Sequence, residues 1–258
     1  MYPEILSIGP ITLYSYGAML AAAFLVGNWL LGREWMRAGH TNSKVPDQIL
    51  IGAVVGGLVG SKLLYAFTEG IDYFVRDPLG TLFSGAGLIF HGGLGLAMLI
   101  VAWVIKRHSV KWLDVADLGA PIILLSYSIA RIGCFLSGDG DYGPPSDLPW
   151  AMAFPNGTVP TTVPVHPTPL YEVVASTAVF SLLWRMRTRP AVRGWMAGWA
   201  FLAIGLERVV AEYWRINADV GWGFSQAQWI SVAMAIAGAR MISTRWKTVK
   251  KLRHGQSG

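Results

Sequence analysis

Two arginines lie inside apolar stretches of the chain, where a charged side chain is unfavourable. Arg131 lies near the end of the run from Val115 to Leu136, and Arg208 lies in the run from Trp195 to Trp214. Placing an arginine at the centre of a membrane-spanning helix costs roughly 2.5–3.5 kcal/mol, so each side chain needs a partner. A guanidinium stays ionised, and its planar fork can bond two oxygens of a phosphate. The pattern predicts that Arg131 faces an anion at a membrane surface.

A glycine-rich turn follows Arg131. The segment from Ser128 to Gly143 reads SIARIGCFLSGDGDYG, and glycines alternate with aspartates near its end: Gly138, Asp139, Gly140, Asp141 and Gly143. Because glycine has no side chain, its backbone N–H groups can approach a ligand closely. We therefore expect this turn to contribute backbone contacts to the anion site.

Polar residues from six apolar segments fall at one depth in the expected helices. At about 1.5 Å per residue, they lie about 3–9 Å below the same end of their segments. They are Tyr16, Lys62, His91, Arg131, Glu172 and Arg208. Ionisable groups inside membrane segments are candidates for function by default. Their shared depth favours one common site.

Members of this layer also have structural interpretations. Lys62 can extend along its apolar stem to the surface, and Tyr16 can belong to an interfacial aromatic belt. Glu172 can cap the start of a helix. Arg208 and Glu212, spaced i and i+4, can form a structural ion pair. The shared depth is harder to explain in these terms than any one residue.

The composition places the apolar segments in a membrane. The chain of 258 residues is 53% hydrophobic and 14% charged, and its mean hydropathy is +0.44. It has too few charged residues to cover a soluble globule of this length. The single cysteine, Cys134, excludes an intramolecular disulfide and a cysteine-based metal cage. Its simplest interpretation is a small buried apolar residue.

Seven apolar segments approach the roughly 20 residues that cross a bilayer. They are Leu13–Leu31, Ile49–Phe67, Ala86–Ile105, Val115–Leu136, Leu170–Trp184, Trp195–Trp214 and Phe224–Met241. The fifth is short, so its helix is expected to begin a few residues earlier. The charged stretch Ile71–Phe83 is predicted to be an interfacial helix. The sequence thus predicts an all-α integral membrane protein with seven transmembrane helices, in which residues 1–258 form one polytopic domain.

Basic residues predict the orientation of these helices, because cytoplasmic flanks carry the excess of Lys and Arg. Sixteen of the 21 basic residues follow the first, third, fifth and seventh segments, and acidic residues occupy the opposite loops. The N-terminus is therefore expected outside, the C-terminus in the cytoplasm, and the polar layer toward the outer face. The stretch MYPEILSIG lacks the basic leader of a removable signal peptide. The net charge of +6 is a topology signal, and no nucleic-acid partner is expected.

The longest outer loop, residues 139–169, is rich in glycine and proline and too polar to enter hydrocarbon. Loops of this length without regular structure are usually functional or disordered. We expect it to form a small extracytoplasmic cap over the site.

Several motifs together resemble those of the bacterial prolipoprotein diacylglyceryl transferases. They are ARIGCFLSGDGDYG at 130–143, FHGGLG at Phe90–Gly95, VHPTPLYE at Val165–Glu172, ERVVAEYWR at Glu207–Arg215, and the pair Tyr16-Gly17. The resemblance covers nearly the whole chain. A lone HGG would be a weak signal, whereas the combination is specific.

This resemblance implies a seven-span enzyme of the bacterial inner membrane that takes the diacylglyceryl group from phosphatidylglycerol. The acceptor would be the lipobox cysteine of a lipoprotein precursor, and the products would be a thioether-linked precursor and glycerol phosphate. No cofactor or metal would be required. By matching positions, the catalytic residues would be His91, Arg208 and Tyr16, and the lipid-binding residues Arg131, Cys134, Ser137, Gly138, Gly143 and Glu212.

The chain departs from the family pattern in four respects. Cys134 stands where the family usually has asparagine, Val165 where arginine is common, and Pro169 where glutamine is common. The turn from Asp139 to Gly143 is one residue longer than the commonest form. The cysteine removes any hydrogen bond that the asparagine amide would make.

The residue types suit such a reaction without reference to the family. Breaking a carbon–oxygen bond to phosphate builds negative charge on the leaving group, which fixed arginines stabilise. A thiol with a reference pKa of about 8.5 needs a base, and His91 is the candidate. We expect Gly92 and Gly93 to leave room beside its ring for a headgroup or peptide. The alternatives are that His91 only orients the lipid or is a hydrogen-bonded core histidine.

Two other functional classes remain open. An anion or lipid transporter would also bury arginines, but its site is expected near the bilayer midplane, often with repeats or broken helices. The sequence has no repeat with a period of 20–50 residues. An inactive structural homologue is the second alternative, favoured by the departures at Cys134 and Val165.

Overall fold

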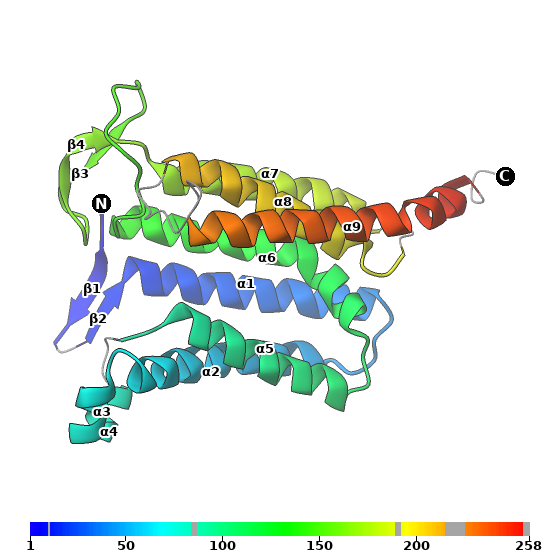
Figure 1. Ribbon diagram of the computed structural model, residues 1–258, viewed down its shortest axis with the longest axis horizontal. Coiled ribbons are helices and arrows are strands. Elements are labelled where there is room, and N and C mark those ends of the chain that lie inside the picture. The colour runs from blue at the N-terminus through cyan, green and yellow to red at the C-terminus, as the bar shows by residue number, and fades with distance from the viewer. Residues whose placement is uncertain (10, 84–86, 189–191, 215–224, 255–258) are drawn as a thin grey trace. The chain divides into compact units, whose positions relative to one another are not determined.

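The structure is a computed structural model that describes residues 1–9, 11–83, 87–188, 192–214 and 225–254 (Figure 1). These residues are mostly helical. They divide into two compact units, one made of Met1–Leu30 with Leu113–Gly258 and the other of Leu31–Trp112. The organisation as one polytopic domain stays a prediction.

Each of the seven predicted spans coincides with a long helix. The helices are α1 (Ser15–Arg37), α2 (Lys44–Phe67), α5 (Phe90–Arg107), α6 (Trp112–Ser137), α7 (Thr168–Met186), α8 (Trp195–Ala211) and α9 (Gln226–His254). In the described residues, α1, α2, α5 and α6 are long and apolar enough to cross a membrane. The predicted early start of the fifth segment is confirmed, because α7 begins at Thr168. Ala86 and Phe224 lie outside the described residues.

Two β-hairpins depart from the all-α expectation. Strands β1 (Glu4–Ile8) and β2 (Ile11–Tyr14) pair antiparallel, as do β3 (Met152–Phe154) and β4 (Thr161–Val165). Leu13 was predicted to begin the first helix, but it lies in β2, because the apolar run starts before the helical backbone, which begins two residues later at Ser15. The second hairpin lies in the predicted 139–169 cap, so this loop has regular structure.

Glycines bring α2 and α5 together in the unit Leu31–Trp112. Gly52, Gly56 and Gly60 are all buried and lie four residues apart on α2, so they form one stripe. A Cβ at Gly56 would lie 2.6 Å from the Cα of Ala97 on α5. Stripes of small residues let helix backbones approach closely in membranes.

The stretch Ile71–Phe83, predicted as one interfacial helix, is instead two short helices. They are α3 (Ile71–Arg76) and α4 (Pro78–Phe83). Pro78 has no N–H and favours the first position of a new helix. The Asp77 carboxylate caps that helix by accepting the N–H of Gly80 at 2.8 Å.

In the other unit, the start of α8 is fixed by a carboxylate from α6. The two Asp117 oxygens accept the N–H groups of Gly194 at 2.6 Å and Ala197 at 2.8 Å. Such a cap satisfies helix N–H groups that have no partner within the helix. The bond orients α8 relative to α6, which are the two helices that carry Arg208 and Arg131. Buried residues of α6, α7, α8 and α9 form the core beside it: Ala120, Leu124, Leu183, Trp195, Met196, Ala200 and Val249.

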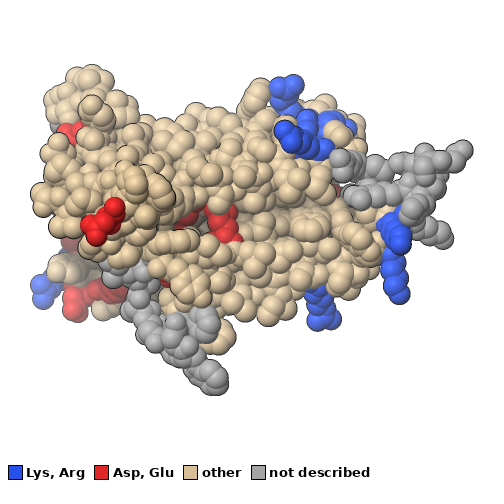
Figure 2. Space-filling view, turned by 90° about the horizontal axis from the view of Figure 1, so that it is seen from above, with Lys and Arg blue, Asp and Glu red and all other residues tan. Residues whose placement is uncertain are grey.

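Apolar side chains cover much of the surface. Every long helix exposes large ones, including Leu25, Leu58, Leu99, Ile123, Leu182, Phe201 and Ile236. On the face shown in Figure 2, residues other than Lys, Arg, Asp and Glu fill most of the view. Extended apolar surface of this kind is suited to lipid and not to water. The protein is therefore a membrane protein.

The cap on α8 gives a test of the fold. We expect Asp117→Ala to lower the free energy of unfolding by about 1–2 kcal/mol, because two N–H groups lose their acceptor. Asp114→Ala is the matched control on the same helix. Its partner Arg193 has a 57% exposed side chain, so we expect a loss below about 1 kcal/mol. Unfolding in detergent micelles measures both, and equal losses would contradict the capping role.

Candidate functional site

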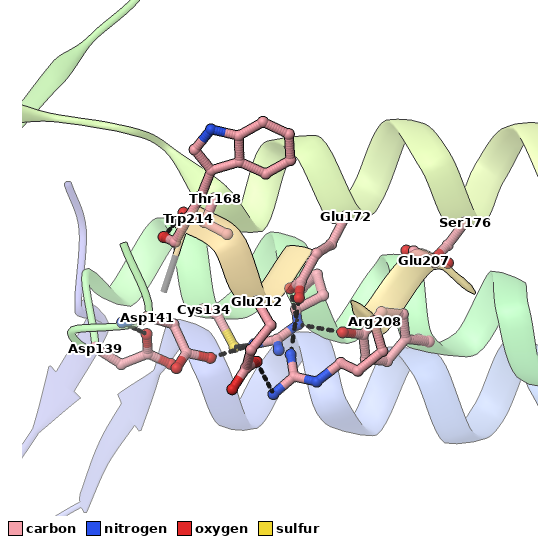
Figure 3. A network of polar contacts seen from close by, with 12 residues as sticks. Cys134, Asp139, Asp141, Thr168, Glu172, Ser176, Glu207, Arg208, Glu212 and Trp214 are labelled. Atoms are coloured by element: carbon pink, nitrogen blue, oxygen red, sulfur yellow. Dashed lines mark hydrogen bonds and ion pairs between the residues drawn. The ribbon is translucent and has the colours of Figure 1, made fainter. Parts of the chain in front are cut away.

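Two arginines from different helices meet one buried carboxylate. Glu172 on α7 is 2% exposed. Its Oε2 lies 2.5 Å from Nε of Arg131 on α6, and its Oε1 accepts a 3.0 Å hydrogen bond from Nη1 of Arg208 on α8 (Figure 3). Arg131 Nε also donates to the Tyr127 hydroxyl at 2.9 Å. Three helices therefore meet at an ionic cluster inside one unit.

The sequence placed Arg131, Arg208 and Glu172 at one depth, and the structure brings these three together. It does not support reading Glu172 as only a helix cap, because its carboxylate bonds the arginines. Tyr127 was missed, although its spacing of four residues before Arg131 is the helical signal that would have found it.

The turn after α6 returns to the same arginine. Arg131 Nη1 contacts the Asp141 carboxylate and also lies 3.4 Å from Cys134 Sγ. Cys134 is buried, as expected, but it is also a weak acceptor for the guanidinium. Its sulfur and the carboxylates of Asp139 and Asp141 lie within 4.8 Å of one another, a spacing that could hold a cation. Arg131 supplies the positive charge there, so these groups belong to the arginine cluster.

Glu212 flanks the second arginine. Arg208 Nη2 lies 3.6 Å from Glu212 Oε2, so the predicted i, i+4 pair is present with a longer separation than that to Glu172. Glu212 begins the short 3₁₀ helix η1 (Glu212–Trp214), and its Oε1 accepts a 2.5 Å hydrogen bond from the Ser225 hydroxyl. Arg215 and Asp219 lie outside the described residues.

Ser137 and Gly138 join the second hairpin to the end of α6. The Ser137 carbonyl accepts the N–H of Thr158 at 2.8 Å, and Gly138 has φ of +58°, which favours glycine at a helix end. A Cβ at Gly138 would lie 2.8 Å from the Cα of Gly157. These predicted lipid-binding residues thus fix the loop directly beside Arg131 and Cys134.

Gly143 lies where two segments cross closely. Its N–H donates to the His166 carbonyl at 2.9 Å. A Cβ there would collide with the Trp214 carbonyl and lie 3.0 Å from Thr168 Oγ1, which itself donates to that carbonyl at 3.1 Å. Only glycine fits, so Gly143 holds the loop against α7 and η1.

Tyr16 packs against α6 in the same unit. A Cβ on Gly133, the neighbour of Cys134, would lie 3.3 Å from the Cα of Tyr16. The close approach brings the start of α1 against the part of α6 that carries Cys134. Its side chain is 43% exposed.

His91 and Lys62 lie in the other unit, so their relation to the arginines stays a prediction. His91 is the second residue of α5 and contacts the Phe90 ring edge-on at 5.9 Å. Lys62 does not simply extend to solvent, because its ammonium donates to the Thr81 carbonyl of α4 at 3.4 Å.

The expectation that Gly92 and Gly93 leave room for a substrate is wrong. A Cβ at Gly92 would meet the Gly60 carbonyl of α2, and one at Gly93 would meet the Ser61 hydroxyl and the Gly57 carbonyl. Helix α2 fills the space. These glycines allow α5 to pack closely on α2 and so hold His91 at its helix start.

An apolar groove of about 510 Å³ runs along α7 and α8 beside the arginine cluster. Its lining is mainly alanine, valine and leucine, with Glu172 and Glu207 as its carboxylates: Tyr171, Glu172, Ala175, Ala178, Val179, Ala203, Leu206, Glu207, Val210, Ala211 and Trp214. The Ser176 hydroxyl donates to Glu207 at 2.5 Å. The site therefore joins fixed cations to an apolar surface, which suits an amphipathic anion.

Known proteins resemble the chain along most of its length. A family model described as prolipoprotein diacylglyceryl transferase matches residues 3–244. Three relatives are named phosphatidylglycerol–prolipoprotein diacylglyceryl transferase. The protein of Bordetella parapertussis is 30% identical over 92% of this chain and 94% of its own length. The protein of Nitrosospira multiformis is 31% identical over 95% and 87%, and that of Pseudomonas aeruginosa is 32% identical over 93% and 94%.

The crossing at Gly143 gives a test of the site. We expect Gly143→Ala to loosen the hairpin loop, because the added methyl displaces the Trp214 carbonyl. Faster limited proteolysis between residues 144 and 165 would report this change. Gly119→Ala on α6 is the control, since the nearest atom to its Cβ would be 4.0 Å away. Unchanged proteolysis of the Gly143→Ala protein would contradict the steric role.

Proposed function

The chain belongs to the prolipoprotein diacylglyceryl transferase family, and from this premise we propose that it transfers the diacylglyceryl group of phosphatidylglycerol to a lipoprotein precursor. The resemblance inferred from the motifs is thereby confirmed. The acceptor is the lipobox cysteine thiol, and the products are a thioether and glycerol phosphate. One observation carries the proposal: two guanidinium groups meet beside an apolar groove.

The arginines are proposed to bind the lipid phosphate. In the described part of the chain, Arg131 Nη2 has no hydrogen-bond or ion-pair partner, and Arg208 Nη2 has only the 3.6 Å contact to Glu212. These donors can bind phosphate oxygens. The precursor sulfur attacks the glyceryl carbon, a carbon–sulfur bond forms, and the carbon–oxygen bond to phosphate breaks. Charge on the departing glycerol phosphate is stabilised by the fixed guanidinium groups.

The remaining predicted residues have supporting roles in this proposal. Tyr16 and His91 act at the thiol, with His91 as the base that takes its proton. Cys134, Ser137, Gly138 and Gly143 shape the turn around the headgroup, and Glu212 orients Arg208. The acyl part of the lipid lies in apolar surroundings such as the groove along α7 and α8.

The proposed setting is the bacterial inner membrane. Seven helices span it, the N-terminus lies outside, the C-terminus lies in the cytoplasm, and the site is toward the outer face. The distribution of Lys and Arg along the sequence supports this orientation. The loop at 139–169 forms an extracytoplasmic cap that admits the precursor. Family membership weighs against the transporter alternative, and turnover separates the enzyme from an inactive homologue.

The arginines provide the direct test of function. We expect Arg131→Gln and Arg208→Gln each to lower transfer by at least about 10²-fold, because a donor to developing charge is lost. The assay is release of labelled glycerol phosphate from phosphatidylglycerol in the presence of a lipobox peptide. Arg76→Gln, on the short helix α3, is the control and should retain near-normal turnover. Normal turnover in the Arg131→Gln protein would overturn the phosphate role.

The role of His91 is tested through the acidity of the thiol. We expect His91→Gln to lower the rate by about 10²–10⁴-fold with an ordinary thiol, as for loss of a general base. The loss should shrink when the peptide thiol has a lower pKa and ionises without help. His108→Gln, at the other end of α5, is the control. An equal loss with both peptides would show that His91 orients the lipid.

A further inference from the structure

Glu172 is the described residue whose carboxylate bonds both arginines. Its Oε2 lies 2.5 Å from Arg131 Nε, and its Oε1 lies 3.0 Å from Arg208 Nη1. Asp141 contacts Arg131, and Glu212 contacts Arg208. Glu172 therefore fixes the spacing of the pair.

The burial of Glu172 separates it from the reacting groups. Its side chain is 2% exposed, whereas that of Arg208 is 25% exposed. A carboxylate that faced the phosphate would repel it. A buried carboxylate that bonds some N–H groups of each guanidinium leaves the other N–H groups available to the phosphate. Arg131 uses Nε for Glu172 and Tyr127 and Nη1 for Asp141 and Cys134. Its Nη2 then remains for a ligand.

Two like charges from different helices repel, and the repulsion is strong where water is scarce. Without an anion between them, the side chains of Arg131 and Arg208 would turn apart and would no longer point toward one phosphate. The Glu172 carboxylate on the third helix, α7, attracts both guanidinium groups, and these two attractions offset the repulsion between them. It holds the clamp ready before any lipid arrives, so the lipid phosphate does not have to assemble it.

We infer that Glu172 is a positioning residue that holds Arg131 and Arg208 in the geometry that binds the phosphate of an anionic phospholipid. The inference rests on the proposed function. Glu172 acts through the two guanidinium groups and does not itself bind the phosphate. Its negative charge, together with the reach of its side chain to both guanidinium groups, sets the relative orientation of the two donors.

The test compares kcat/KM for phosphatidylglycerol in full-length proteins by release of labelled glycerol phosphate. We expect Glu172→Gln to lower it by about 10²-fold, as for a misplacement of about 1 Å. Glu172→Asp keeps the charge but shortens the reach, so we expect an intermediate loss of about tenfold. The matched control is Asp114→Asn, which removes a carboxylate of α6 that pairs with the exposed Arg193. It should stay within about threefold of wild type.

Thermal unfolding of each variant separates positioning from collapse of the fold. Two results would overturn the role of the charge. One is a folded Glu172→Gln protein whose kcat/KM stays within threefold of wild type. The other is a Glu172→Asp protein that is as inactive as the Glu172→Gln protein. If the Gln variant does not fold, the Asp variant decides, and a wild-type rate in it overturns the inference. Normal turnover in Arg131→Gln would instead overturn the proposed function. If the arginine variants lose activity but Glu172→Gln keeps the wild-type kcat/KM, the positioning role alone is overturned.

Discussion

The ion pairs between one carboxylate and two guanidinium groups are the interaction on which the site depends. Two unit positive charges about 5 Å apart repel by roughly 3 kcal/mol at an effective dielectric constant near 20. Glu172, between Arg131 and Arg208, offsets this repulsion and ties α6, α7 and α8 at one level. Buried ion pairs are often no more stabilising than apolar packing of equal volume. The proposed binding of a lipid phosphate would give these ion pairs a role other than stability.

Much of the framework around this cluster is visible in the sequence. A run of apolar residues is a local property, so each of the seven predicted spans overlaps a long helix, although α1 continues beyond Leu31 to Arg37 and α9 beyond Met241 to His254. The position of a charge within such a run is also local, which is why the depth of Arg131, Glu172 and Arg208 indicated a common layer. The motifs also predicted the reaction, because they resemble those of a family of known activity.

Contacts between segments were not visible in the same way. The sequence shows that Gly92 and Gly93 follow His91, but it does not show that α2 fills the space beside them. The first hairpin was missed because its second strand, β2, leads directly into α1 and its apolar residues resemble the start of that helix. The placement of Asp117 of α6 on the start of α8 likewise depends on how helices pack.

The turn after α6 explains how the chain accommodates its unusual residue at position 134. An asparagine there would offer the guanidinium a strong oxygen acceptor, whereas the Cys134 sulfur is a weak one at 3.4 Å from Nη1. The Asp141 carboxylate, on the turn that follows α6, contacts the same Nη1. Charge-assisted hydrogen bonds are stronger than neutral ones. The Asp141 carboxylate thus gives Nη1 of Arg131 a stronger acceptor than the Cys134 sulfur does.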